Sequence, residues 1–157
     1  MAAGRERWLG VSVASCRIAY VLLIGGQVKE WAKSREATKT VPKARSFIRM
    51  AMERHKPDYV VLEDPGGKTR KRGQSLKILQ ALVQDLKDNS QAHCLRERSH
   101  SYANKHEEAI ALAKDHPELE PELPKRHAFY DNEDPKIAYF EALSLVEKGI
   151  RAHSKGK

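Results

Sequence analysis

The sequence predicts an α/β protein built on a mixed five-stranded sheet, with helices on both faces. The first third of the chain holds three short apolar runs separated by turn residues, and the remainder alternates helical patterns with short apolar runs. Runs joined by tight turns predict antiparallel strands. A strand that follows a helix predicts a parallel partner, because parallel strands need a long crossover. We expect residues 1–157 to form one domain, with flexible tails at residues 1–7 and 153–157.

The first third predicts a meander of three antiparallel strands. Residues 8–14 are rich in valine and alternate in size, and residues 18–24 form a nearly continuous apolar run. A short turn over residues 15–17 joins these two strands. The glycine pair at residues 25–26 predicts a tight hairpin into a third strand over residues 27–32, because glycine accepts the backbone angles that such turns require.

The next segment predicts a helix and then a buried strand. Residues 39–55 place apolar side chains at helical spacing, and Pro42 fits the first turn, where its missing N–H would have no helical partner. Residues 58–64 then form a short, almost wholly apolar run. Such a run after a helix predicts a strand that is buried on both faces and lies parallel to an earlier strand.

The rest of the chain predicts three more helices and a fifth strand. Ser101 is a suitable N-cap for the second of these helices, whose expected buried face includes Ala109, Ile110 and Leu112. The Pro- and acid-rich connector before the last helix is not expected to be regular throughout. In chain order we expect a basic loop at 65–73, a helix at 75–86, a strand at 91–96, a helix at 101–113, the connector at 116–124 and a helix from about 134 to about 152.

The composition excludes several classes of protein. A net charge of +8 favours a polyanionic partner such as nucleic acid. Cys16 and Cys94 are too few for a disulfide framework or for a four-cysteine zinc site. A mean hydropathy of −0.66, without an apolar run of about 20 residues, argues against a membrane span. Because no apolar segment follows the basic start of the chain, we expect no signal peptide and a cytoplasmic location.

Several short segments together resemble a known family. Residues 9–15 (LGVSVAS) with residues 18–21 (IAYV) resemble the first hairpin of the RuvC-like branch of the ribonuclease H-like superfamily, which includes Holliday-junction resolvases. Residues 60–63 (VVLE) resemble its fourth strand, and residues 133–134 with residues 140–143 (FEAL) resemble its acidic C-terminal helix. The resemblance implies a ribonuclease H-like fold and a nuclease that uses Mg²⁺ or Mn²⁺. It also implies a nucleic-acid partner, with DNA favoured over RNA, and a homodimer.

The resemblance further implies that Glu63, Asp134 and Glu141 are catalytic residues and metal ligands. Such nucleases clamp the reacting oxygens between two ions about 3.5–4 Å apart, and hard cations need oxygen ligands from several elements. Each residue also has a structural alternative. Glu63 could be solvated or ion-paired at its strand end, Asp134 could only cap the last helix before Pro135, and Glu141 could face solvent. Asp134 and Glu141 are about 10 Å apart along a helix, so we do not expect both to bind the same ion.

Ser12 is the fourth candidate catalytic residue, because it stands where the family's first strand carries an aspartate. A hydroxyl is a poor Mg²⁺ ligand, so this departure puts catalysis itself in question. Asp64 follows Glu63 directly but does not automatically compensate, because successive strand side chains point to opposite faces. Three explanations stay open: a degenerate nuclease, an aspartate-to-serine variant, or a different alignment of the first strand.

Two basic segments near the expected acidic site are candidates for nucleic-acid binding. The first lies in a glycine-containing loop soon after Glu63, and the second mixes basic and aromatic residues before the last helix. Either could instead be a solvated loop, and Phe129 and Tyr130 could be ordinary packing residues. The candidate residues are Lys68, Arg70, Lys71, Arg72, Lys125, Arg126 and His127.

The remaining signals are weaker. The histidines show no metal-binding spacing, and we expect most of them to lie at the surface.

The family resemblance and the basic charge together predict a nucleic-acid-binding protein that hydrolyses phosphodiesters of structured DNA, or of RNA, with a divalent metal. Two alternatives remain: a catalytically inactive nucleic-acid-binding module on the same fold, and a regulatory protein whose basic loop meets an acidic partner.

Overall fold

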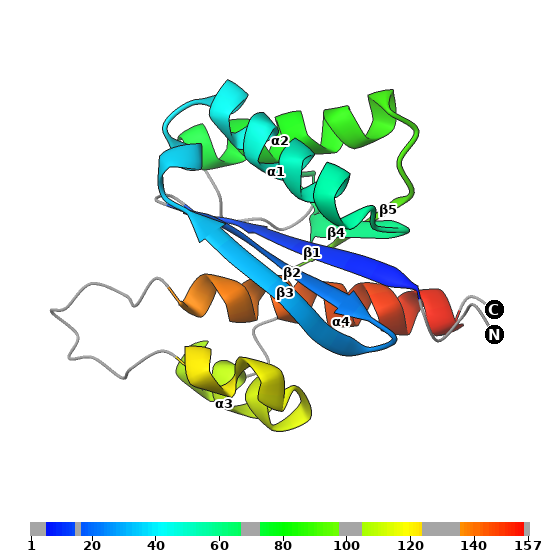
Figure 1. Cartoon of the computed structure of the whole chain (residues 1–157). Coiled ribbons are helices and arrows are strands. Elements are labelled where there is room, and N and C mark those ends of the chain that lie inside the picture. The colour runs from blue at the N-terminus through cyan, green and yellow to red at the C-terminus, as the bar shows by residue number, and fades with distance from the viewer. Residues whose placement is uncertain (1–5, 15–16, 67–72, 98–104, 124–135, 156–157) are drawn as a thin grey trace, which may run out of the picture.

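The computed structural model describes residues 6–14, 17–66, 73–97, 105–123 and 136–155. In Figure 1, α1 and α2 cover one face of a sheet, α4 covers the other, and α3 lies beyond α4. The elements in chain order are β1 (Arg7–Val13), β2 (Ile18–Ile24), β3 (Gln27–Ser34), the 3₁₀ helix η2 (Glu36–Thr38), α1 (Val41–His55), β4 (Tyr59–Glu63), α2 (Gly73–Asp88), β5 (His93–Arg96), α3 (Lys105–Asp115), the 3₁₀ helix η3 (Pro117–Glu122) and α4 (Ile137–Lys155).

The sheet is mixed and has five strands in the order β3-β2-β1-β4-β5. The β1–β2 and β2–β3 pairs are antiparallel, whereas the β1–β4 and β4–β5 pairs are parallel. Gly25 and Gly26 form the turn between β2 and β3 with φ angles of 60° and 82°, which a side chain would strain. The predicted architecture of three antiparallel strands followed by parallel βα units is confirmed.

Side-chain alternation along the central strands divides the core into two layers. Leu9 and Val11 of β1 and Leu62 of β4 pack in the cluster beneath α1 and α2. Trp8 of β1 and Val61 of β4 pack in the cluster on the α4 side. Alternate residues of a strand share a face, so these residues show to which face of the sheet every other side chain of β1 and β4 points.

Helix α4 approaches the sheet closely because glycine occupies two of the contact positions. A Cβ atom added to Gly10 would lie 2.5 Å from the carbonyl oxygen of Ala142 and 2.7 Å from Cβ of Val146. One added to Gly149 would lie 2.6 Å from Cγ2 of Val61. Only glycine allows this spacing without a shift of the helix, so α4 is seated directly on β1 and β4.

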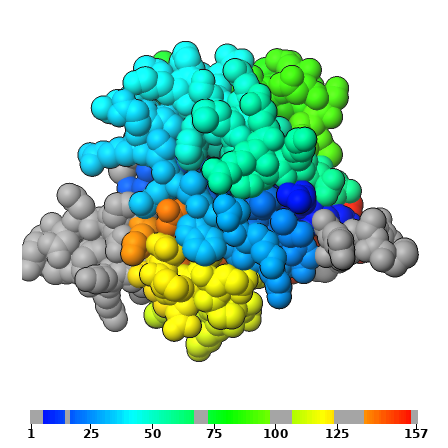
Figure 2. Space-filling view, viewed as in Figure 1, coloured from blue at the N-terminus to red at the C-terminus, as the bar shows by residue number. Residues whose placement is uncertain are grey.

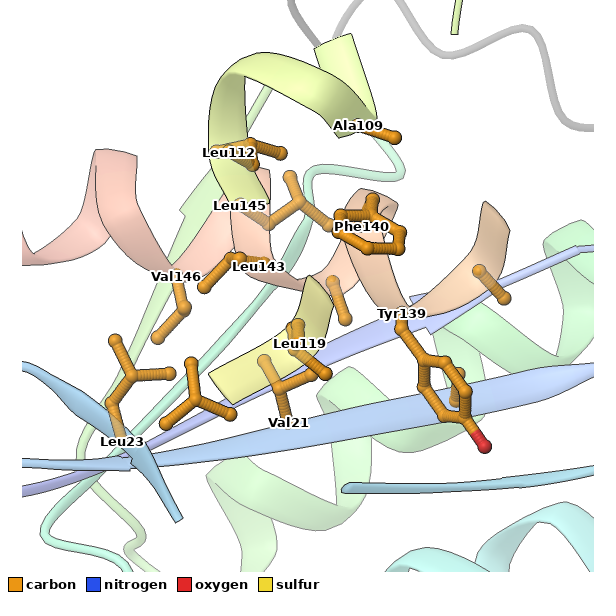
Figure 3. Packing of buried hydrophobic residues seen from close by; sticks show 14 of the residues in the cluster. Val21, Leu23, Ala109, Leu112, Leu119, Tyr139, Phe140, Leu143, Leu145 and Val146 are labelled. Atoms are coloured by element: carbon orange, nitrogen blue, oxygen red, sulfur yellow. The ribbon is translucent and has the colours of Figure 1, made fainter. Parts of the chain in front are cut away.

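Helix α3 forms a further layer on the outer side of α4. In Figure 3, Ala109 and Leu112 of α3 lie beside Phe140 and Leu145 of α4, and Leu119 of η3 fills the same cluster. The space-filling view of Figure 2 places α1 above β3 and the region of α3 and η3 below it.

The third helix and the connector after it differ in detail from the sequence prediction. Ile110 is 51% exposed rather than buried, because α3 packs along one face against α4 and η3 and leaves this position on the outer side. Within the connector, Pro117–Glu122 form the 3₁₀ helix η3, which accommodates proline in its first turn. The expected starts of the third and last helices, at Ser101 and at residues 134–135, lie outside the described residues.

Two residues expected in the tails belong to regular elements. Arg7, expected in a flexible tail, opens β1 and donates its backbone N–H to the carboxylate of Asp58 at 2.8 Å. His153, expected in the other tail, lies in α4 and packs against the rings of Trp8 and Tyr59. Across the described ranges, we find no helix with both the length and the apolar character needed to cross a membrane.

Candidate functional site at the carboxyl end of the sheet

The carboxyl ends of β1 and β4 bring Ser12 and Glu63 side by side on the α4 face. The strands are parallel, and their pairing extends to Gly10 opposite Val61. Two residues further along each strand, Ser12 and Glu63 therefore point to the same face of the sheet. Their exposed fractions are 3% and 5%. Glu63 is therefore turned toward the C-terminal helix and away from solvent.

Glu141 lies in the second turn of α4 and is also buried, with an exposed fraction of 6%. Helix geometry gives the direction of its side chain. Lys148, two turns later on the same side of the helix, donates a hydrogen bond from Nζ to the carbonyl oxygen of Glu97 at 2.7 Å, directly after β5. Glu141 therefore lies on the side of α4 that faces β4 and β5, and the alternative that it faces solvent is excluded.

Ser12 is hydrogen-bonded to the helix itself. Its hydroxyl donates to the carbonyl oxygen of Ala138 at 2.9 Å in a buried contact. Ala138 lies three residues before Glu141, so this bond fixes the first turn of α4 against the end of β1. A neutral hydroxyl serves here as a donor, whereas a carboxylate at the same place would set two acceptors against each other.

Two arginines that the sequence analysis did not single out lie at the same end of the sheet. Arg96 is the last residue of β5 and the register partner of Glu63. Cys94 packs on the α4-side cluster, so Arg96, two residues later, points to the α4 side as well. Arg17 is buried just before β2, and its carbonyl oxygen accepts the N–H of Ala14 across the turn from β1. The edge therefore carries positive as well as negative side chains.

Asp64 belongs to the turn after β4. Its carboxylate accepts the N–H of Gly66 at 2.9 Å, and its own N–H donates to the carbonyl oxygen of Arg96 at 3.0 Å. The carboxylate is thus used to form the turn.

Three solved nuclease structures resemble this architecture although their sequences are distant. Thermus thermophilus RuvC in complex with Holliday junction substrate matches with a TM-score of 0.68 at 10% identity, over 97% of this chain and 97% of that one. Fowlpox virus resolvase with Holliday junction DNA matches at 0.58 and 18%, over 94% and 99%. The large terminase nuclease of thermophilic phage G20c, with bound magnesium, matches at 0.54 and 16%, over 90% and 80%. No family model and no curated protein sequence matches the chain.

The chain has a ribonuclease H-like fold. The likeness extends over 90% or more of its length in each case, so the fold expected from the short motifs is confirmed. At these identities the likeness establishes the fold alone.

The ribonuclease H-like fold brings Ser12, Glu63 and Glu141 to one end of the sheet beneath α4. In the described ranges, no group of three or more His, Cys, Asp or Glu side chains could hold a metal ion. The other candidates lie outside the described residues, namely Asp134, Lys68, Arg70, Lys71, Arg72, Lys125, Arg126 and His127.

Two of the histidines that the structure describes are buried rather than at the surface. His55 is buried at the end of α1, with Nε2 3.4 Å from the hydroxyl of Tyr20, and burial lowers its pKa. His116 is buried before η3, and its hydrogen bond to Glu147 at 2.7 Å raises its pKa. Both join secondary-structure elements away from the carboxylate edge of the ribonuclease H-like sheet.

Proposed function

We propose that this chain binds structured DNA and hydrolyses its phosphodiester bonds with the help of a divalent metal ion. The observation that carries the proposal is the burial of two carboxylates, Glu63 at the end of β4 and Glu141 in the second turn of α4, on two elements that pack together. RuvC and fowlpox virus resolvase, solved with Holliday junctions, support a branched DNA substrate.

The donor set fits a hard divalent cation. Carboxylate oxygens are the ligands that Mg²⁺ and Mn²⁺ prefer, and Glu63 and Glu141 offer them from a strand and a helix that pack together. In this proposal Asp134 is a ligand of a second ion rather than of the one between Glu63 and Glu141, and Ser12 leaves its position uncharged. A bound ion would supply a hydroxide nucleophile at neutral pH and stabilise charge on the phosphate. The two glutamates would hold the ion, and α4 would shield them from bulk water.

The basic segments would supply the contacts to the DNA backbone. The chain carries a net charge of +8, and four of its positive side chains lie in one short segment soon after Glu63. Phosphate contacts of this kind position a duplex without reading its sequence. A homodimer would present one site to each of two related strands of a four-way junction. The proposed contacts are Lys68, Arg70, Lys71, Arg72, Lys125, Arg126 and His127.

A second candidate function, binding without cleavage, is favoured by the hydrogen bond from Ser12 to Ala138. This bond seats α4 on the end of β1 through a neutral contact. A site with one carboxylate fewer would bind a divalent ion more weakly, while the basic segments would still contact phosphates.

Cleavage of a labelled junction tests the proposal. The full chain is incubated with a fluorescent four-way DNA junction in Mg²⁺, in Mn²⁺ or in EDTA, beside a linear duplex of the same sequence and the equivalent RNA. We expect nicks in the DNA junction only with metal, and their loss in Glu63→Gln. Glu53→Gln, which neutralises an exposed acid on α1, is the matched control and should cleave normally.

The same experiment separates the candidate functions. Junction binding that weakens steeply as salt rises, with no cleavage in either metal, would select binding without cleavage. If none of these nucleic acids binds in a salt-dependent way, both candidates are refuted, and an acidic protein partner for the basic segments becomes the better hypothesis.

A further inference from the structure

Arg96 is the positively charged neighbour of Glu63 in the sheet. The two residues are register partners at the ends of β5 and β4. Both point toward α4, because Cys94 and Val61, two residues earlier in each strand, pack in the cluster on that side. A guanidinium group is thus placed next to the carboxylate that we propose as a metal ligand.

The protein leaves hydrogen-bonding capacity on this guanidinium unused. Nε of Arg96 is buried and has no hydrogen-bond partner. None of the ion pairs between described residues involves Arg96. Buried N–H groups without partners are rare in native proteins, and an absent ligand is one of the few ordinary explanations. Arg96 therefore has the character of a binding residue rather than of a structural ion-pair partner.

The backbone that carries Arg96 is tied to both of its neighbours. Its carbonyl oxygen accepts the N–H of Asp64 at 3.0 Å, and the next carbonyl oxygen, that of Glu97, accepts Nζ of Lys148 at 2.7 Å. The end of β5 is thus joined to β4 and to α4 at the point where the side chain begins. The guanidinium on this anchored backbone is a planar fork of N–H donors, which suits an anion with two acceptor oxygens, as phosphate has.

We propose that Arg96 is a phosphate-binding residue that donates hydrogen bonds to a backbone phosphate of the nucleic acid beside Glu63. This inference rests on the proposed function, which supplies the nucleic acid. A phosphodiester is repelled by Glu63 and Glu141, so a site that brings it to them benefits from a fixed positive charge in addition to a metal ion. Arg96 supplies this charge from the sheet itself.

The test compares Arg96→Gln with Arg49→Gln, which removes the same charge from the exposed face of α1 across the sheet. Binding of a labelled four-way DNA junction is measured by fluorescence anisotropy in EDTA, over about 50–200 mM salt. We expect Arg96→Gln to weaken binding on the order of 10- to 100-fold and to reduce the salt slope by about one. Arg49→Gln should change neither quantity.

Arg96→Lys and thermal denaturation distinguish phosphate binding from a structural role. The lysine keeps the charge but lacks the fork, so it should restore the salt slope and only part of the affinity. All three variants should melt close to the wild-type temperature. If Arg96→Gln lost stability but bound the junction as the wild-type chain does, the proposal would be overturned. If Arg96→Gln did not fold, an unchanged affinity in Arg96→Lys would overturn it instead.

The outcomes also separate this inference from the function on which it rests. If the wild-type chain binds the junction and Arg96→Gln matches Arg49→Gln in affinity and slope, the role of Arg96 is refuted and the proposed function stands. If the wild-type chain shows no salt-dependent binding, the proposed function and the role of Arg96 are refuted together.

Discussion

Ser12 joins two layers of the molecule through one side chain. Its hydroxyl reaches the backbone of Ala138 inside the protein, where solvent screening is weak. An aspartate at this position would hold a carboxylate against a carbonyl oxygen, with no proton between them. A divalent cation shared with Glu63 would turn this repulsion into attraction. The effect of a carboxylate at position 12 therefore reports whether a metal site is present.

Ser12→Asp should make the stability of the chain depend on divalent metal. In EDTA we expect the free energy of unfolding to fall by about 2–4 kcal/mol, because an uncompensated charge is buried. Millimolar Mg²⁺ or Mn²⁺ should restore part of it by binding only the folded state, and metal affinity and any nicking should rise. Urea denaturation with and without metal measures the first effect, with the uncharged Ser12→Asn as control. Unchanged metal affinity and nicking in Ser12→Asp would place residue 12 outside the metal position.

His116 gives a pH-dependent contribution with a defined sign. Its hydrogen bond to Glu147 raises its pKa above the ordinary value of 6.5, with Glu118 and Asp115 adding in the same direction and burial opposing. The stabilisation is therefore complete below pH 6.5 and is lost as pH rises through the raised pKa. We expect His116→Gln to be destabilised by about 1–2 kcal/mol at pH 5.5, and by less as pH increases. Urea denaturation across this range measures the difference, and a difference independent of pH would contradict the assignment.

His55 provides the opposite trend as a control for that experiment. Burial lowers the pKa of His55 below 6.5, so the folded state disfavours its charged form. The wild-type chain should therefore lose the contribution of His55 as pH falls below 6.5, and His55→Gln should remove this loss. Opposite slopes for the two variants would show that each histidine acts through its own surroundings.

Among the elements, α4 sets the geometry of the candidate site, because it carries Glu141 and seats it against β4. The close packing of α4 on the sheet depends on Gly10, where an added Cβ atom would lie 2.5 Å from the carbonyl oxygen of Ala142. Backbone atoms cannot rotate out of the way as a flexible side chain can. Any added atom at Gly10 must therefore push the helix away from the sheet.

Gly10→Ala should destabilise the fold and weaken the site together. We expect a loss of about 1–3 kcal/mol in the free energy of unfolding, from overpacking between β1 and α4, together with weaker Mn²⁺ binding. Gly66→Ala is the matched control. A Cβ atom added to Gly66 would lie 3.5 Å from Oδ1 of Asp64, which is an ordinary van der Waals contact. Urea denaturation and calorimetric Mn²⁺ titration measure the two effects. If Gly10→Ala behaved like Gly66→Ala, the close seating of α4 would not matter.

The strands and most helices could be predicted because their signals are local. Apolar runs, the pair Gly25 and Gly26, and Pro42 each act through their own backbone and nearest neighbours. The exposed face of α3 could not be predicted in the same way. Ile110 has the composition of a buried residue, but its exposure depends on which side of α3 meets α4, and this is decided by packing between distant segments.

At the scale of the whole molecule, the candidate site joins elements from both halves of the chain. Glu63 could be placed from sequence because a parallel strand ends at a known edge. The burial of Glu141 could not, since its position on the helix allows either surroundings. Arg96 was missed because its importance depends on the register of β5 against β4, which sets it beside Glu63. The sequence does hold a signal, because Arg96 ends an expected strand two residues after Cys94, which is partly buried against the α4-side cluster.

The most direct test asks whether Glu63 and Glu141 hold one metal ion together. Calorimetric titration with Mn²⁺ is carried out on the wild-type chain, on Glu63→Gln, on Glu141→Gln and on the double variant. We expect the wild-type chain to bind Mn²⁺, each single substitution to weaken binding by at least about 10-fold, and the double variant to lose little more, because groups that act as a unit are not additive. A shared site would be contradicted if the wild-type chain did not bind Mn²⁺. It would also be contradicted if the fold-loss of Mn²⁺ affinity in the double variant equalled the product of the fold-losses in the two single variants.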